Sequence, residues 1–123
     1  MYYAAGLIVP KTLGEFEQLI LFALLELEDE EAYGVSIRGV ISARTGREVS
    51  TGAVYTALDR LREHGLVTSW VGDPTGERGG RRKRLYQLEP AGAEALARSV
   101  QIFRDMSEGL LGRLAQHLQG GSG

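Results

Sequence analysis

The side chains of this 123-residue sequence that could carry covalent or metal chemistry are few and scattered. The sequence has no cysteine, which excludes disulfides, thiolate metal sites and a cysteine nucleophile. Its two histidines, His64 and His117, form neither an H-x-x-x-H pair nor a cluster with carboxylates. Gly79 and Gly80 lie between two expected strands, so they do not predict a nucleotide-binding loop. We therefore expect no enzyme activity, no metal site and no cofactor.

The densest group of functional side chains is a run of cations in the segment Arg78-Gly-Gly-Arg-Arg-Lys-Arg84. Five of its seven residues are cationic: Arg78, Arg81, Arg82, Lys83 and Arg84. Arginines in a glycine-rich loop suit contact with a minor groove or a phosphate backbone of DNA. The alternative is a solvated turn whose cations protect an edge strand from pairing. The elements around the run decide between these interpretations.

The charge of the chain is unevenly distributed, although its net charge is only −2. Residues 34–88 contain ten bases and five acids, residues 11–32 one base and seven acids, and residues 89–123 three bases and four acids. A local basic patch, rather than overall basicity, is typical of a face that binds phosphate. The acidic run at 28–31 is interpreted as a solvated turn before a helix.

Two helices joined by a short turn precede the cationic run. Apolar spacing predicts helices at 34–45 and 51–64, with Gly46 ending the first and Ser50 capping the second. The turn between them covers only residues 46–49. Such a connection is typical of a helix-turn-helix, whose second helix enters the major groove of DNA.

The expected helix at 51–64 has an apolar face and a face that could meet DNA. Val54, Leu58 and Leu61 cluster on the apolar face and are expected in the core. Small side chains in the leading turn let the backbone approach phosphate or base edges. The candidate DNA-binding residues here are Ser50, Thr51, Gly52, Ala53, Tyr55, Thr56 and Arg60. For Tyr55 two interpretations stay open, because its hydroxyl could bind phosphate or its ring could pack on the preceding helix.

A β-hairpin follows and carries the cations. Strands are expected at 66–71 and 82–88, joined by a glycine-rich loop at 72–80. Strand alternation places Arg82 and Arg84 on one face and Lys83 on the other. Beside a helix-turn-helix such a hairpin is a wing, and all five cations of the run are candidate DNA contacts.

The first and last helices carry more apolar surface than one small domain covers. Thr12 and Glu15 are spaced as a capping box before a helix at 13–28 that is apolar nearly all round. Pro90 starts a last helix that should run to Leu118. Its apolar stripe consists of Leu96, Val100, Phe103, Leu110, Leu114 and Leu118. Burial in the chain's own core is the alternative; we expect instead a seam with a second copy, whose last helix also covers the first helix.

These elements predict a mainly α-helical fold with a small β-hairpin, a winged helix-turn-helix followed by a long dimerisation helix. We expect an N-terminal tail at 1–11, the DNA-binding domain at 12–89, the dimerisation helix at 90–118 and a flexible tail at 119–123. No apolar run is long enough to cross a membrane, and the first ten residues do not read as a secretory signal. We therefore expect a cytoplasmic protein without membrane contact.

Several short motifs together resemble the PadR family of transcription regulators. They are Leu13-Gly-Glu-Phe-Glu-Gln-Leu-Ile-Leu21, Ala32-Tyr-Gly34, Ser50-Thr-Gly-Ala-Val-Tyr-Thr-Ala-Leu58, Gly65-Leu-Val67 and Gly79-Gly-Arg-Arg-Lys-Arg-Leu-Tyr-Gln-Leu88. Each motif alone is weak, but the combination is specific. The resemblance implies a dimeric repressor of the short-tailed subgroup. Some members of that subgroup bind flat aromatic or cationic molecules at the dimer interface, beside an aromatic residue that Phe103 matches here.

We therefore expect a homodimeric, sequence-specific regulator that binds a double-stranded DNA operator. It is expected to repress transcription and to be released by a planar aromatic small-molecule effector near Phe103. The alternative is a winged-helix protein-interaction module without DNA binding, which exposed apolar side chains on the wing and on the outward face of the helix at 51–64 would favour. A small-molecule sensor is a further interpretation, compatible with the first.

Overall fold

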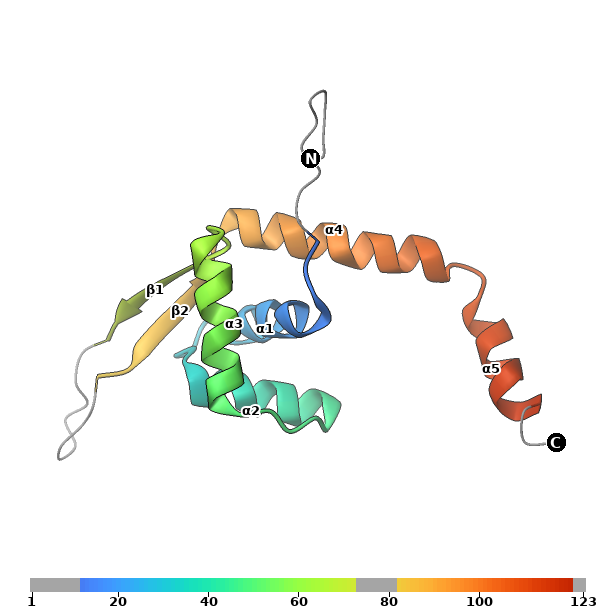
Figure 1. The fold of residues 1–123 in the computed structure, drawn as a ribbon, viewed down its shortest axis with the longest axis horizontal. Coiled ribbons are helices and arrows are strands. Elements are labelled where there is room, and N and C mark those ends of the chain that lie inside the picture. Colours follow the sequence, from blue (N-terminus) through green and yellow to red (C-terminus); the bar gives the residue numbers. More distant parts are fainter. Residues whose placement is uncertain (1–11, 73–81, 121–123) are drawn as a thin grey trace, which may run out of the picture.

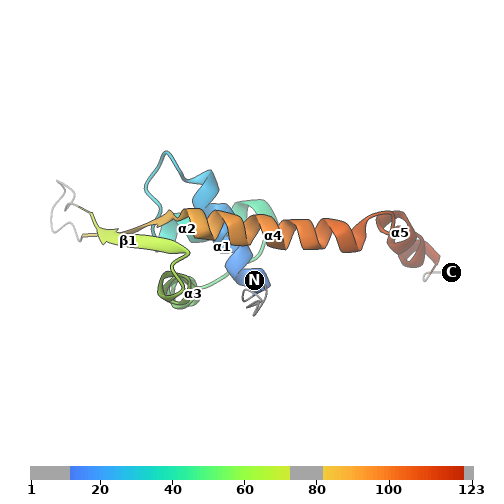
Figure 2. The ribbon, with the colours of Figure 1, turned by 90° about the horizontal axis from the view of Figure 1, so that it is seen from above.

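A computed structural model describes residues 12–72 and 82–120 of the chain (Figure 1). Its elements follow in the order α1 (Glu15–Glu26), α2 (Gly34–Thr45), α3 (Thr51–Glu63), β1 (Val67–Val71), β2 (Arg84–Leu88), α4 (Pro90–Ser107) and α5 (Leu111–Gly120). Helices α1 to α3 form one body, the hairpin projects from one side, and α4 runs the opposite way to carry α5 (Figures 1 and 2). The predicted mainly helical fold with a small hairpin is confirmed.

The hydrophobic core lies between α1, α2 and α3 and is closed by β2 and the first turns of α4. Ile20 and Leu21 of α1 and Ile37 of α2 are fully buried. The inner face predicted for α3 is confirmed, since all its members are buried: Val54, Leu58 and Leu61. On α1, however, Phe22 and Leu25 remain 45% and 39% exposed. One side of α1 therefore carries apolar surface that its own chain leaves open.

α1 begins two residues later than the sequence predicts, because a different pair of residues caps it. The side-chain oxygen Oε1 of Glu17 accepts a hydrogen bond from the N–H of Gly14 at 2.9 Å. The spacing is that of a capping box, shifted from the expected Thr12 and Glu15. Leu13 is buried in the core just before the cap, which fixes where the helix can start. Glu15 therefore takes no part in this cap, and its carboxylate pairs with Arg47 instead.

α3 begins at the predicted Thr51 and ends at Glu63, one residue before the predicted end. The Ser50 hydroxyl accepts a hydrogen bond from the N–H of Ala53 at 3.0 Å. At the other end the N–H of Leu66 donates to the carbonyl of Leu61 at 2.9 Å, and the N–H of Gly65 donates to the carbonyl of Arg62 at 2.9 Å. This pair of bonds is a Schellman motif. It turns the chain directly from α3 into β1.

The hairpin, called the wing below, is antiparallel and attached to the body. Val67 lies opposite Leu88, and Val71 lies opposite Arg84. The strands start slightly later than the predicted 66 and 82. The N–H of Tyr86 in β2 donates to the carbonyl of Ala32, in the segment before α2, at 2.9 Å. This bond helps to fix the direction in which the wing leaves the body.

The single last helix predicted for 90–118 is wrong, because the structure contains two helices. α4 ends at Ser107, and Glu108 adopts an extended ψ of 126°. Gly109 then has a φ of 75°, a left-handed conformation that glycine adopts without steric cost. The apolar stripe is also interrupted here, because the polar Ser107 occupies the stripe position between Phe103 and Leu110. The chain therefore changes direction before α5 (Figure 1).

The apolar stripe of the last helices also divides into two parts. Leu96 is only 3% exposed and belongs to the chain's own core, with Val100 packed against that core. The expectation that a second subunit mainly buries Leu96 is therefore wrong, because the first turns of α4 lie on the body. The remaining members of the stripe are 44–74% exposed: Phe103, Leu110, Leu114 and Leu118.

Candidate nucleic-acid interface

The leading turn of α3 presents small side chains to solvent. Gly52, Ala53 and Thr56 are exposed, and Thr51 is half-buried. The hydroxyl of Thr56 donates to the carbonyl of Gly52 at 3.0 Å. The first N–H groups of a helix have no intrahelical partner, and with the helix dipole they attract anions. This turn is thus shaped to approach a phosphate or a base edge closely.

Tyr55 lies beside this turn and connects three elements. Its hydroxyl accepts a hydrogen bond from the N–H of Gly34, at the start of α2, at 3.2 Å. Its ring centroid lies 6.2 Å from that of Tyr86 in β2, with the rings tilted by 49°. A Cβ at Gly34 would come within 2.5 Å of the Tyr55 ring. Of the two interpretations of Tyr55, the structure has the ring packed on α2, where it fixes α3 relative to α2 and the wing.

Three of the candidate arginines are exposed on α3 and the wing: Arg60, Arg82 and Arg84. On the wing, Nη1 of Arg84 donates to Oγ of Ser69 across the hairpin at 3.3 Å. This bond directs the Arg84 side chain along the strand pair. Two further candidates, Arg78 and Arg81, lie outside the described residues. These exposed arginines supply positive charge suited to phosphate.

Lys83 differs from its neighbours, because its side chain turns back toward the body. Its Nζ lies 3.2 Å from Oε1 of Glu31 and 4.4 Å from the centroid of the Tyr33 ring. Its side chain is 34% exposed. The hydrogen bond with the Glu31 carboxylate raises the pKa of the Lys83 ammonium. Lys83 therefore ties the wing to the segment before α2 and does not share the face of Arg82 and Arg84.

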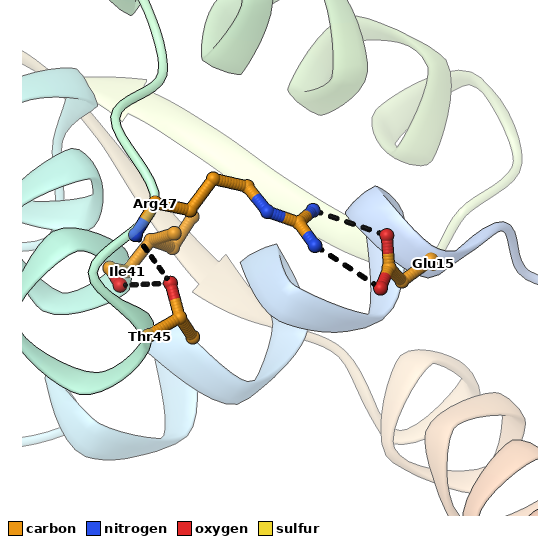
Figure 3. A network of polar contacts seen from close by, with 4 residues as sticks. All are labelled: Glu15, Ile41, Thr45 and Arg47. Carbon is orange, nitrogen blue, oxygen red and sulfur yellow. Dashed lines mark hydrogen bonds and ion pairs between the residues drawn. The ribbon is translucent and has the colours of Figure 1, made fainter. Parts of the chain in front are cut away.

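Sequence reasoning missed a second tie, which joins the helix-turn-helix to α1 (Figure 3). Nη1 and Nη2 of Arg47, in the turn before α3, lie 3.0 and 3.2 Å from the two carboxylate oxygens of Glu15. The N–H of Arg47 donates to Oγ1 of Thr45 at 3.0 Å, and that hydroxyl donates to the carbonyl of Ile41 at 2.7 Å. Hydrogen bonding from Arg47 lowers the pKa of the Glu15 carboxyl. Opposite charges 32 residues apart left no local pattern to detect.

A hollow of about 580 Å³ lies between α1 and α4. Phe22 of α1 and Phe103 and Met106 of α4 supply its apolar lining. Glu15 and Gln18 supply polar groups at the same hollow. Phe103, the residue expected beside an effector, thus lies at a concave surface of its own chain and is 67% exposed.

Comparison with known proteins identifies the family. The model of the transcriptional regulator PadR-like family matches residues 22–98, more than half of the chain. The chain belongs to the PadR-like family. The transcriptional regulator Rv3488 of Mycobacterium tuberculosis is 33% identical over 94 residues, which cover 75% of this chain and 81% of that protein.

Solved structures of PadR-like regulators share the fold. A PadR family transcription regulator from Clostridium difficile R20291 has a TM-score of 0.65 and 28% sequence identity, covering 82% of this chain and 99% of its own. Bacillus subtilis PadR, solved in complex with operator DNA, has a TM-score of 0.55 and 21% identity, covering 69% of this chain and 46% of its own. The likeness to the second establishes the fold alone.

The PadR-like assignment confirms the family and the winged helix-turn-helix class that the sequence predicts. It also confirms that the protein is a transcriptional regulator rather than an enzyme. Within residues 12–72 and 82–120, no group of three or more histidine, cysteine or carboxylate side chains is placed to hold a metal ion. In the same part of the chain, no helix is long and apolar enough to span a membrane.

Proposed function

We propose that this PadR-like regulator binds operator DNA as a homodimer and represses transcription in the cytoplasm. The leading turn of α3 enters the major groove, and the wing arginines lie on the neighbouring backbone or minor groove. The observation that carries this proposal is the exposed turn of small residues capped by Ser50, together with the exposed Arg82 and Arg84 of the wing. The DNA complex of Bacillus subtilis PadR, which has the same fold, supports it.

Exposed apolar surface on α1 and α4 supports the homodimer. Phe22, Ile102, Phe103 and Met106 are between 45% and 70% exposed. Apolar side chains that adjoin one another in this way mark interaction sites on soluble proteins. A second copy of the chain, related by a two-fold axis, would cover them and place the two α3 helices on successive half-sites.

The effector belongs to the same proposal. The hollow between α1 and α4 accepts a planar aromatic molecule that stacks on Phe103 and lies against Phe22 and Met106. Binding there changes how α1 and α4 meet the second copy. Glu15 also lines the hollow and forms an ion pair with Arg47, in the turn before α3. A molecule bound in the hollow therefore affects that turn through Glu15. We expect release of the operator as the result.

The substitution Gly52→Gln tests the DNA face. A Cβ at Gly52 would meet only Oγ of Ser50, at 3.9 Å, so the variant should fold. A long side chain there obstructs entry into the groove, so operator affinity should fall far more than affinity for random DNA. Fluorescence anisotropy on both DNAs measures the difference. Glu63→Gln, at the far end of α3, is the matched control.

Two outcomes would contradict the DNA proposal. One is a Gly52→Gln variant that loses operator and random DNA equally while it stays folded. The other is a parent protein that binds no DNA even at low salt. The second would favour a protein-interaction module, which the 45% and 48% exposure of Trp70 and Val71 on the wing supports. The outward face of α3 has no large exposed apolar side chain among the described residues, which supports DNA.

A further inference from the structure

The backbone of β1 has an inner side, which is bonded to β2, and an outer side. The N–H of Gly72 donates to the carbonyl of Lys83 at 2.8 Å, so these residues form a hydrogen-bonded pair of the wing ladder. In an antiparallel ladder such pairs alternate with pairs that exchange no hydrogen bond. Val71 and Arg84, which lie opposite each other, therefore form a pair of the second type. The backbone N–H and carbonyl groups of Val71, and likewise those of Ser69, point outward from β1.

The outer edge of β2 is protected, whereas the outer edge of β1 is open. On β2, the outward N–H of Tyr86 donates to the carbonyl of Ala32 at 2.9 Å, and Arg84 adds a charge, which hinders pairing with another strand. Within residues 12–72 and 82–120, no backbone hydrogen bond reaches β1 from its outer side. β1 has the sequence Val67-Thr-Ser-Trp-Val71, without charge or proline. An edge of this kind is a template for a further strand.

A second β1 strand would satisfy the outward groups of this edge. If two copies run antiparallel with Trp70 opposite Trp70, then Ser69 of each copy lies opposite Val71 of the other. Their outward N–H and carbonyl groups then face each other and exchange hydrogen bonds in both directions. The two Trp70 side chains, exposed in the single chain, occupy a non-hydrogen-bonded position, where opposite side chains come closest and aromatic pairs are stabilising. The open edge is thus complementary to itself.

The wing is placed to meet a neighbouring dimer rather than the partner within its own dimer. It projects from one side of the body, and α4 and α5 extend the opposite way (Figures 1 and 2). The exposed apolar side chains that support the homodimer, Phe22 and Phe103 among them, lie on α1 and α4. The wings therefore lie at the outer ends of the proposed dimer, where a second dimer on the same DNA comes close.

We propose that β1 of one dimer pairs with β1 of a neighbouring dimer, antiparallel and centred on Trp70. Two dimers on adjacent stretches of one DNA molecule are joined in this way, so binding of the first raises the affinity of the second. Arg82 and Arg84 stay available for DNA, because they lie on β2 and on the residues before it. The inference rests on the proposed DNA-binding homodimer and adds a contact between dimers.

The substitution Val71→Pro tests the strand pairing. Proline removes the outward N–H of Val71, and edge strands accept proline where this group faces solvent, so the wing should keep its own ladder. In light scattering at rising concentration, the parent should grow beyond the mass of a dimer. Val71→Pro should raise the dissociation constant of this further association about tenfold or more. The matched control Val71→Thr keeps the N–H and should associate as the parent does.

The same measurement separates failure of the strand pairing from failure of the homodimer. A Val71→Pro variant with the same mass as the parent at every concentration would overturn the strand pairing. A Val71→Pro variant that is monomeric where the parent is dimeric would support the strand pairing and contradict the homodimer through α1 and α4.

The absence of cysteine from the sequence allows a second test by disulfide trapping. Opposite residues at a non-hydrogen-bonded position are close enough for a disulfide. Trp70→Cys, bound to long random-sequence DNA and treated with oxidised glutathione, should give a product of two chains on a denaturing gel. The matched control Gln87→Cys changes an exposed residue of β2 and should give little product. Equal yields from the two variants would overturn the proposal.

Discussion

The cationic side chains of the wing differ in their contacts, although they are neighbours of the same charge in the sequence. The cations at 81–84 stand next to one another, and strand alternation already separates Lys83 from Arg82 and Arg84. Its partner Glu31, however, is 52 residues away in the sequence. No local pattern connects residues so far apart, so only the folded chain reveals that Lys83 holds the wing while the arginines stay exposed.

A salt titration should separate these two roles. In the proposed dimer, Arg82→Ala removes one phosphate contact from each subunit, so the slope of log K against log salt should become shallower by roughly two units. Lys83→Ala removes a tie inside the protein, so it should lower DNA affinity and leave the slope unchanged. Fluorescence anisotropy at several salt concentrations measures both. Equal losses of slope would place Lys83 on the DNA together with Arg82.

Gly34 offers a second test at a single residue. A Cβ there would lie 2.5 Å from the ring of Tyr55, so Gly34→Ala should destabilise the protein by about 1–3 kcal/mol. Gly39→Ala in the same helix meets nothing within 4 Å. It should stabilise α2 by up to about 1 kcal/mol, since alanine favours helix. Urea unfolding compares them, and similar effects of the two substitutions would contradict the packing role of Tyr55.

Among the secondary-structure elements, local signals predict helix ends better than helix continuity. Ser50, Gly46 and Gly65 mark their helix ends correctly, because caps depend on a few adjacent residues. The start of α1 is missed because Thr12–Glu15 and Gly14–Glu17 have equivalent spacing, and the burial of Leu13 decides between them. The break before α5 is missed because periodicity counts positions and does not detect a change of backbone direction at one glycine.

The link between α1 and the turn before α3 should be visible in the pH dependence of stability. The Glu15 carboxyl has a pKa lowered from 4.5 in the folded state. Its contribution is therefore present above that value and is lost as pH falls through the lower folded pKa. Glu15→Gln should lower the free energy of unfolding at neutral pH, and its difference from the parent should shrink in acid.

The control for this link is Glu28→Gln, an exposed carboxyl in the acidic run. This substitution also removes one carboxylate and leaves the contact between Glu15 and Arg47 in place. Arg47→Met should reproduce the Glu15→Gln profile, and the double variant should add little to either. Thermal or urea unfolding between pH 3 and pH 7, about the range of carboxyl titration, measures these differences. Additive effects of the two substitutions would contradict a shared contact.

Considered as a whole, the molecule exposes apolar side chains along α1, α4 and α5, among them Phe22, Phe103 and Leu114. The sequence predicts the stripe on the last helices, and periodicity assigns Leu96 and Phe103 to it equally. The structure separates them, because the body covers only the first turns of α4. Which residues of the stripe stay exposed depends on how far the body covers α4. That coverage is a property of the tertiary structure, so the spacing of apolar residues in the sequence does not predict it.

A charge placed on the exposed part of α4 should therefore disrupt assembly without unfolding the chain. Phe103→Glu should shift the protein toward monomer, since Phe103 is 67% exposed and contributes little to its own core. Gln101→Glu, on another side of α4, should leave the dimer intact. Light scattering gives the mass, and circular dichroism confirms that both variants fold. A folded Phe103→Glu variant with unchanged mass would exclude this face from the interface.

The ion pair of Glu15 and Arg47 connects α1 to the helix-turn-helix, and the same helix carries part of the surface proposed to contact a second copy. Through Glu15 the helix holds the turn before α3, and through Phe22 it borders the surface offered to a second copy. In the proposed dimer the separation and relative rotation of the two α3 helices are thereby set by α1. Half-sites on B-DNA recur once per helical turn, about 34 Å. Operators for this regulator should therefore be palindromes whose spacer can vary in base sequence but not in length.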